Sequence, residues 1–98
     1  MATQNQEQII IEEYIIERLL TLPKYHIILH NDDIHDMLFV VAALLQTITS
    51  LGRAGAFEIM LRAHQTGKAI IATMPRETAE FYCGELRNKG LLTTIEPA

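Results

Sequence analysis

The chain has 98 residues, enough for one domain with a single modest hydrophobic core. Hydrophobic residues make up 49% of it and charged residues 20%, which is typical of a folded globular protein and excludes disorder throughout. The net charge is −4, from 8 Lys and Arg against 12 Asp and Glu, and the cations form no cluster. Because phosphate binding needs clustered cations, the sequence predicts no nucleic-acid partner.

Cysteine content and hydropathy bear on the compartment. Cys83 is the single cysteine, which excludes an internal disulfide and fits a reducing compartment. No stretch reaches the roughly 18 apolar residues that a membrane span needs, and the start MATQNQEQ lacks the cationic residues of a signal peptide. We therefore expect no membrane association and a location in the cytosol, or in an organelle interior after loss of a transit sequence.

Residues 1–23 are predicted to form an arm separate from the rest of the chain. Residues 1–7 are polar, and Pro23 ends whatever helix forms before it. An isolated helix of this length is marginal in water, because helix nucleation is costly. The arm is therefore expected to be mobile or marginally helical and loosely attached. Its apolar residues at helical spacing are Ile11, Ile15, Leu19 and Leu22.

The predicted core, residues 24–98, begins with a strand over KYHIILH, in which apolar and polar positions alternate, so that Ile28 is expected on the less buried side. A helix follows from Met37 to Leu51, where apolar residues recur at i, i+3, i+4 and i+7 and form a face wide enough to cover a sheet. Either Asp33 or Asp36 is expected to cap its first turn.

Glycines and prolines divide the remainder of the core. Gly52 and Gly55 predict a break before a second helix that carries Met60 and His64 on one face and stops at Gly67. A β-branched strand covers residues 69–73, a third helix follows Pro75 and stops at Gly90, and residues 91–96 form a closing strand. The order β-α-α-β-α-β predicts an α+β fold in which a small three-stranded antiparallel sheet is covered by three helices.

Polar side chains lie between the first strand and the helix that follows it. Asn31, Asp32 and Asp33 end the strand, and the fold can bring them to one edge with His64. Taken singly, the acidic segment also fits a solvated Asx turn, and His64 fits a histidine bonded to nearby backbone. Both interpretations stay open. The combination predicts a small acidic, hydrogen-bonding site beside the apolar residues Met37, Val40 and Met60.

Metal and enzyme chemistry are weaker interpretations. No Cys/His pair has the spacing of a structural zinc site, and no G-x-S-x-G motif is present. Cys83 lies on an apolar helical stripe, where a thiol is usually inert packing, and a chain of this size rarely provides a sugar cleft. We predict no enzyme activity, no metal and no cofactor. The potential metal ligands, which are not expected to converge, are His30, Asp32, Asp33, His35 and His64.

Four segments resemble one known family. YHIILHNDD followed by MLFVV, then IMLRAHQTGKAI, and LLTTIEPA at the C-terminus resemble ClpS, the adaptor that delivers proteins with destabilising N-terminal residues to the Clp chaperone-protease. The resemblance covers Lys24 to Ala98 and implies the same α+β fold. It also implies a non-enzymatic protein of the bacterial cytoplasm or the plastid stroma.

The resemblance implies a site for a free N-terminus. Asn31, Asp32 and His64 match the groups that hold the α-amino group of the ligand, and Asp33 supports the same loop. The implied ligands are proteins or peptides that begin with bulky hydrophobic residues of the Leu, Phe, Tyr and Trp class. The apolar wall around the first side chain is matched by Met37, the gatekeeper against bulk near the backbone, and by Val40, Met60 and Leu91.

The chain departs from the family pattern at several positions. Ala63 stands where relatives usually have Val, and Ile34-His35-Asp36 replaces the common Tyr-Thr-Pro, which removes a hydroxyl that helps hold the ligand backbone. Ala63, Ile34 and His35 are expected to belong to the hydrophobic pocket, and these changes affect the choice among Leu, Phe, Tyr and Trp.

The resemblance also implies a partner, the N-terminal domain of a Clp-type AAA+ unfoldase, which the arm engages during hand-over. Glu77 matches an acidic residue of the family's docking surface, whereas Tyr82 stands where relatives can have Lys. An alternative function is that of a regulator of the same fold, which docks on the unfoldase without presenting substrates. A metal-dependent enzyme is a more distant alternative.

Overall fold

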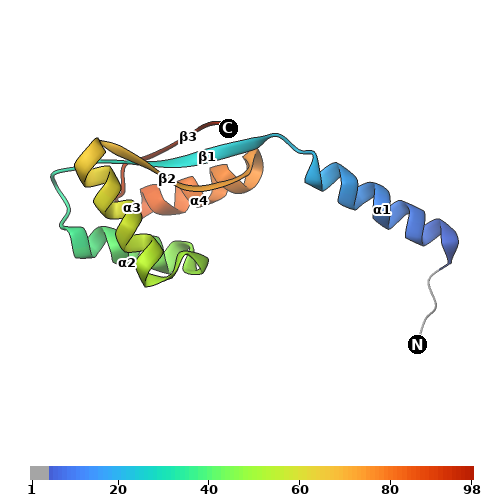
Figure 1. The fold of residues 1–98 in the computed structure, drawn as a ribbon, viewed down its shortest axis with the longest axis horizontal. Coiled ribbons are helices and arrows are strands. Elements are labelled where there is room, and N and C mark those ends of the chain that lie inside the picture. Colours follow the sequence, from blue (N-terminus) through green and yellow to red (C-terminus); the bar gives the residue numbers. More distant parts are fainter. Residues whose placement is uncertain (1–4) are drawn as a thin grey trace.

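The computed structural model describes residues 5–98, and its centre is a three-stranded antiparallel sheet (Figure 1). Strand β1 (Lys24–His30) lies in the middle, between β2 (Lys68–Pro75) and β3 (Thr93–Pro97). Both neighbours pair with β1 in the antiparallel sense, so the strand order is β2-β1-β3. The predicted strands and their antiparallel arrangement are confirmed.

Three helices cover one face of this sheet: α2 (Met37–Thr47), α3 (Gly52–Thr66) and α4 (Arg76–Asn88) (Figure 1). The backbones of α3 and α4 are adjacent to the strands, whereas α2 is adjacent to α3 and α4. Small buried residues on α3 and α4 allow this close approach, because an Ala side chain keeps the backbones near each other. The predicted α+β class and element order are confirmed. The fully buried side chains include Ile27, Leu44 and Leu86, one from each of β1, α2 and α4.

Strand β1 is more buried than simple alternation predicts. Ile28 is only 3% exposed, although it lies outside the main core cluster and pairs with Ile70 and Thr94 on the neighbouring strands. The ladder between β1 and β2 shifts register between Ile27 and Ile28. Cross-strand neighbours on both sides therefore contribute to the burial of Ile28.

The helix boundaries differ from the prediction at two places. Helix α2 ends at Thr47, and a 3-10 turn, η1 (Thr49–Leu51), leads directly into α3. The predicted break at Gly55 is wrong, because this residue lies inside α3. The backbone departs from helical geometry at Ile48, with φ −125° and ψ 78°, and at Gly52, with a positive φ of 69°. Gly67 ends α3 as predicted, in the left-handed region.

The N-terminal arm contains helix α1 (Gln6–Leu20), which projects away from the sheet and helices (Figure 1). Asn5 and Gln8 form a capping box at its start, with the Gln8 amide donating to Asn5 Oδ1 at 2.9 Å. In the described part of the chain, the backbone of α1 is not close to another helix or strand, and its Ile and Leu side chains are exposed. Leu19, near the end of α1, lines a hollow with Tyr25 and Pro75. Residues 1–4 of the predicted arm lie outside the described residues, and the domain boundary after residue 23 stays a prediction.

Within residues 5–98, no single helix has the length and hydropathy of a membrane span. Helix α2 and the segment Thr49–Thr66 meet that criterion only as a pair, with a bend of 110° between them. Their apolar residues Leu44 and Ala56 are both fully buried in the core of the fold.

Candidate functional site

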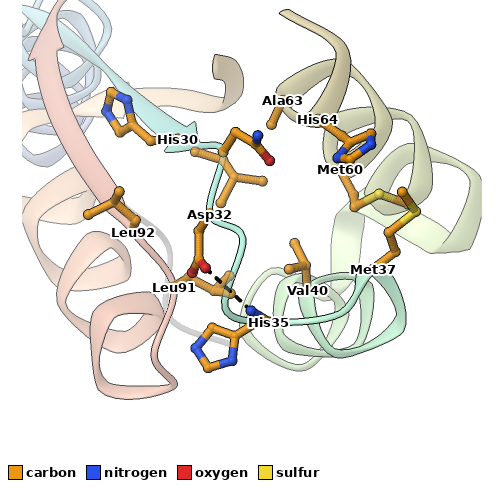
Figure 2. A pocket seen from close by; sticks show the side chains of 12 residues that line it. His30, Asp32, His35, Met37, Val40, Met60, Ala63, His64, Leu91 and Leu92 are labelled. Atoms are coloured by element: carbon orange, nitrogen blue, oxygen red, sulfur yellow. Dashed lines mark hydrogen bonds between the residues drawn. The ribbon is translucent and has the colours of Figure 1, made fainter. Parts of the chain in front are cut away.

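A pocket of about 40 Å³ lies where the end of β1, the start of α2, the end of α3 and the turn between α4 and β3 meet (Figure 2). Polar and apolar side chains line it together. The polar lining residues are His30, Asn31, Asp32, His35 and His64. The apolar lining residues are Leu29, Met37, Val40, Met60, Ala63, Leu91 and Leu92.

The loop after β1 is positioned by backbone hydrogen bonds to two other elements. The His30 amide donates to the Leu92 carbonyl and the Asn31 amide donates to the Gly67 carbonyl, both at 2.9 Å. These bonds place the loop between the C-terminal end of α3 and the start of β3. Asn31 is therefore held beside the last turn of α3, which carries His64.

Asp32 makes the Asx turn that the sequence left open as one interpretation. Its Oδ1 accepts from the Ile34 amide at 2.6 Å and from the His35 amide at 3.3 Å. Figure 2 shows the Asp32 side chain turned toward His35 and away from His64. One carboxylate oxygen thus holds the loop in shape, and Oδ2 makes no hydrogen bond within residues 5–98.

The helix cap is made by Asp36 and not by Asp33. Asp36 Oδ1 accepts from the Phe39 amide at 2.7 Å, which satisfies a free donor in the first turn of α2. Asp33 is exposed and makes no hydrogen bond or ion pair within the described range. The cap fixes the start of α2 and with it the position of Met37.

The side chains of Asn31 and His64 are both free to bind a ligand. Both residues are exposed at the pocket, and neither side chain has a hydrogen bond or ion pair to any residue from 5 to 98. The alternative in which His64 bonds to nearby backbone is thus not what the structure shows. An uncharged imidazole and a side-chain amide oxygen can each accept a hydrogen bond from a donor group of a ligand.

The apolar side chains that line the pocket differ in their exposure to solvent. Met37 is 43% exposed, whereas Met60, Ala63 and Leu91 are 4%, 2% and 4% exposed. Val40 is half-buried, and Figure 2 shows it between Met37 and Leu91. All five of these predicted wall residues therefore line the pocket, with Met37 at its outer side.

Two predicted site residues lie outside the pocket. Asp33 and Ile34 line an adjoining open groove of about 500 Å³, and the Ile34 side chain is 88% exposed. His35 lines both the pocket and the groove. In the structure Ile34 lines the groove and not the pocket, and its contact with a ligand stays a prediction.

The two predicted docking residues are on α4, away from the pocket. Glu77 is exposed in the first turn of the helix and lines a separate hollow with Leu22, Tyr25 and Pro75. Tyr82 is half-buried and packs against the core cluster.

Three pocket residues were not predicted. Leu29 and His30 directly precede Asn31 at the end of the strand, and Leu92 directly follows Leu91. These three residues could have been predicted from the sequence, because each is next to, or two positions from, a residue that was predicted to line the pocket. The imidazole of His30 is already paired, with Nε2 2.6 Å from Thr94 Oγ1.

The potential metal ligands do not converge. Within residues 5–98, no group of three or more His, Cys, Asp or Glu side chains is arranged to hold a metal ion. Cys83 is buried in the core, with its Sγ 3.5 Å from Thr93 Oγ1.

Comparisons with known proteins identify a family to which this chain is similar. A family model described as "ATP-dependent Clp protease adaptor protein ClpS" matches residues 21–94. The adapter protein ClpS of Synechococcus elongatus is 45% identical over 75 residues, which are 76% of this chain and 79% of that protein. The chloroplastic adapter protein CLPS1 of Chlamydomonas reinhardtii is 40% identical over 75 residues, and the match spans 76% of this chain and 46% of the longer relative.

A solved structure also matches. Agrobacterium tumefaciens ClpS2 bound to L-phenylalaninamide superposes with a TM-score of 0.73 and 27% sequence identity, over 78% of this chain and 98% of that one. The family model, the bacterial and chloroplastic relatives and the shared fold lead to one conclusion. The chain belongs to the ClpS family of Clp protease adaptors.

Proposed function

We propose that this chain is an adaptor that binds the free α-amino group and the bulky hydrophobic first side chain of substrate proteins and delivers them to a Clp-type AAA+ unfoldase. The observation that carries the proposal is a pocket with two unpartnered polar side chains, Asn31 and His64, next to a buried apolar wall. The related ClpS2 structure supports it, because L-phenylalaninamide has both a free α-amino group and a bulky apolar side chain.

The polar side chains suit an ammonium group. The pKa of an α-amino group in a short peptide is about 7.7–8.0, and a nearby carboxylate favours its charged form, which has three N–H donors. Asn31 offers an amide oxygen and uncharged His64 offers a ring nitrogen as hydrogen-bond acceptors. Asp32, which holds the same loop as Asn31, contributes a negative charge at the pocket. An internal peptide nitrogen has no charge and a single donor at most, so the site discriminates against it.

The expected affinity follows from opposing contributions. Burial of a Leu or Phe side chain contributes roughly 1.5–3 kcal/mol, and each hydrogen bond to a charged group contributes about 1.5–3 kcal/mol. Association costs at least about 4 kcal/mol in lost translational and rotational freedom. The net result is a dissociation constant nearer micromolar than picomolar, which also lets an adaptor release its substrate.

Delivery is proposed to use surfaces separate from the pocket. Glu77 is exposed on α4 and available to a partner, whereas half-buried Tyr82 contributes mainly to packing. The arm carries α1, which projects away from the core (Figure 1), and it is proposed to engage the unfoldase during hand-over, in a bacterial cytoplasm or a plastid stroma. No chemical step is involved, and binding and release alone constitute the mechanism.

The direct test is fluorescence anisotropy with labelled peptides that differ only at residue one, which is Leu, Phe, Tyr, Trp, Ile or Ala. We expect micromolar or tighter binding of several bulky residues and at least tenfold weaker binding of Ala, because the apolar wall stays unfilled. Failure of every peptide to bind would favour the regulator that docks on the unfoldase without presenting substrates.

Met37 is expected to determine the response to β-branched first residues. A β-branched residue has two heavy atoms on Cβ, close to the ligand backbone, where Met37 and Val40 narrow the outer part of the pocket. Wild type should bind a Leu peptide about tenfold more tightly than an Ile peptide, and Met37→Ala should reduce this ratio to about threefold or less.

The matched control for that experiment is Leu38→Ala. Leu38 is the next residue of α2, its side chain is 80% exposed, and it does not line the pocket. The ratio of Leu to Ile affinities should therefore stay at its wild-type value in Leu38→Ala. Equal binding of Leu and Ile peptides by the wild-type protein would contradict the assignment of Met37.

A further inference from the structure

The groove beside the pocket is continuous with it. Asp32, His35, Leu91 and Leu92 line both the pocket and the open groove of about 500 Å³. A ligand whose first side chain fills the pocket therefore has a direct path into the groove. The inference in this subsection depends on the function proposed above.

The arrangement of the pocket gives the direction of that path. His64, at the end of α3, and His35, in the loop before α2, lie at opposite sides of the pocket (Figure 2). With the α-amino group held at Asn31 and His64, as proposed above, a first peptide bond directed toward His35 would bring the second residue to the groove.

The imidazole of His35 has a fixed orientation at this crossing point. Its Nε2 lies 3.0 Å from the Gly90 carbonyl oxygen, and because a carbonyl only accepts, Nε2 carries the proton. The ring also stacks on Phe39, with centroids 4.4 Å apart and 24° between the planes. Two contacts from different elements thus hold a flat ring between the pocket and the groove.

Gly90 provides the space that this contact needs. A Cβ on Gly90 would lie 3.0 Å from His35 Nε2, and the φ of +95° is disfavoured for other residues. The turn between α4 and β3 therefore both accepts the hydrogen bond and leaves room for the ring. The same turn leads into Leu91 and Leu92, so His35 joins the loop to the opposite wall of the pocket.

Exposed apolar side chains line the groove together with His35 and with the charged residues Asp32, Asp33 and Arg87. Ile34 is 88% exposed and Leu92 is 54% exposed, and they come from the loop and from the segment before β3. Neither side chain belongs to the core cluster. We propose that Ile34, His35 and Leu92 form a second subsite, which binds the side chain of the ligand's second residue and favours an apolar one.

The test uses two sets of peptides with free N-termini in anisotropy titrations. The first set begins Leu-Ser, Leu-Ala, Leu-Val or Leu-Leu, and the second begins Ala-Leu or Ala-Ser. For wild type we expect Leu-Leu to bind roughly fivefold more tightly than Leu-Ser, because the second side chain is only partly buried in an open groove. A first-residue preference of Leu over Ala should be present at the same time.

Three variants should reduce the second-residue preference, and Ile34→Ser, whose residue lines the groove but not the pocket, should also keep the first-residue preference. In Ile34→Ser, Leu92→Ser and His35→Ala, the ratio of Leu-Leu to Leu-Ser affinities should fall to below about twofold, since each variant removes one wall of the groove. Leu38→Ser is the matched control, because Leu38 is also an exposed apolar residue, at 80%, but lies outside the groove. It should keep the wild-type ratio.

Each outcome separates the subsite from the proposed function. Equal wild-type affinity for Leu-Leu and Leu-Ser, with tight binding of both, would overturn the subsite and leave the proposed function intact. Loss of the ratio in Leu38→Ser to the same degree as in the three groove variants would also overturn it. Absence of binding by every free-amine peptide would overturn the proposed function and the subsite together.

Discussion

Acetylation of the α-amino group is expected to weaken the binding of a Leu-initiated peptide by at least about 100-fold. An ammonium donates up to three hydrogen bonds and carries a charge, whereas an acetylated nitrogen is neutral and has one N–H. The free side chains of Asn31 and His64 then lose their donors, and the charge of Asp32 loses its counterpart. The Leu side chain alone cannot replace these contributions, because its burial is the smaller part of the binding free energy.

The measurement compares the dissociation constants of two peptides of identical composition. One carries the acetyl group on the α-amino nitrogen, and the other carries it on the side chain of a Lys near the C-terminus. Only the first should bind weakly. Similar affinities for the two peptides would show that the pocket recognises the side chain without the N-terminus.

Replacement of His64 by Ala should weaken binding of a free Leu peptide by more than about tenfold, since a charged donor loses one of its acceptors. His64 is exposed and makes no hydrogen bond or ion pair within residues 5–98, so its removal leaves no unsatisfied group in the protein. The free energy of unfolding should therefore stay within about 0.5 kcal/mol of wild type. Titration with the Leu peptide, together with denaturant unfolding, separates the two effects.

The matched control for His64 is the next residue of the same helix turn. Gln65→Ala removes an exposed polar side chain that does not line the pocket, so both affinity and stability should be unchanged. A dissociation constant for His64→Ala equal to that of wild type would assign amine binding to Asn31 and the loop carboxylates instead.

The fold was predictable where the apolar periodicity of an element agrees with its buried face. Helix α4 is an example, because Ala79, Cys83 and Leu86 recur at helical spacing and are all buried. The error at Gly55 has a physical cause, because a single glycine inside a helix costs only about 1 kcal/mol and does not by itself end it. The burial of Ile28 depends on side chains of two neighbouring strands, which a local pattern does not contain.

The site was only partly predictable. Spacing indicated that Asn31 and His64 can approach each other, and the structure places both at one pocket. The role of Asp32 in the turn depends on the conformation of Ile34 and His35, which several polar loop sequences can adopt. The contact between His35 and Gly90 joins residues 55 positions apart, so it follows from the packing of α4 and not from any local pattern.

The hydrogen bonds within the loop after β1 have a kinetic consequence. Asp32 closes the turn, Asp36 caps α2 and His35 contacts Gly90, all through hydrogen bonds made within the protein itself. The conformational entropy of ordering this loop is therefore lost during folding and not during association. Substrates with different first residues should then associate at similar rates, and the preference among them should arise from how long each complex lasts.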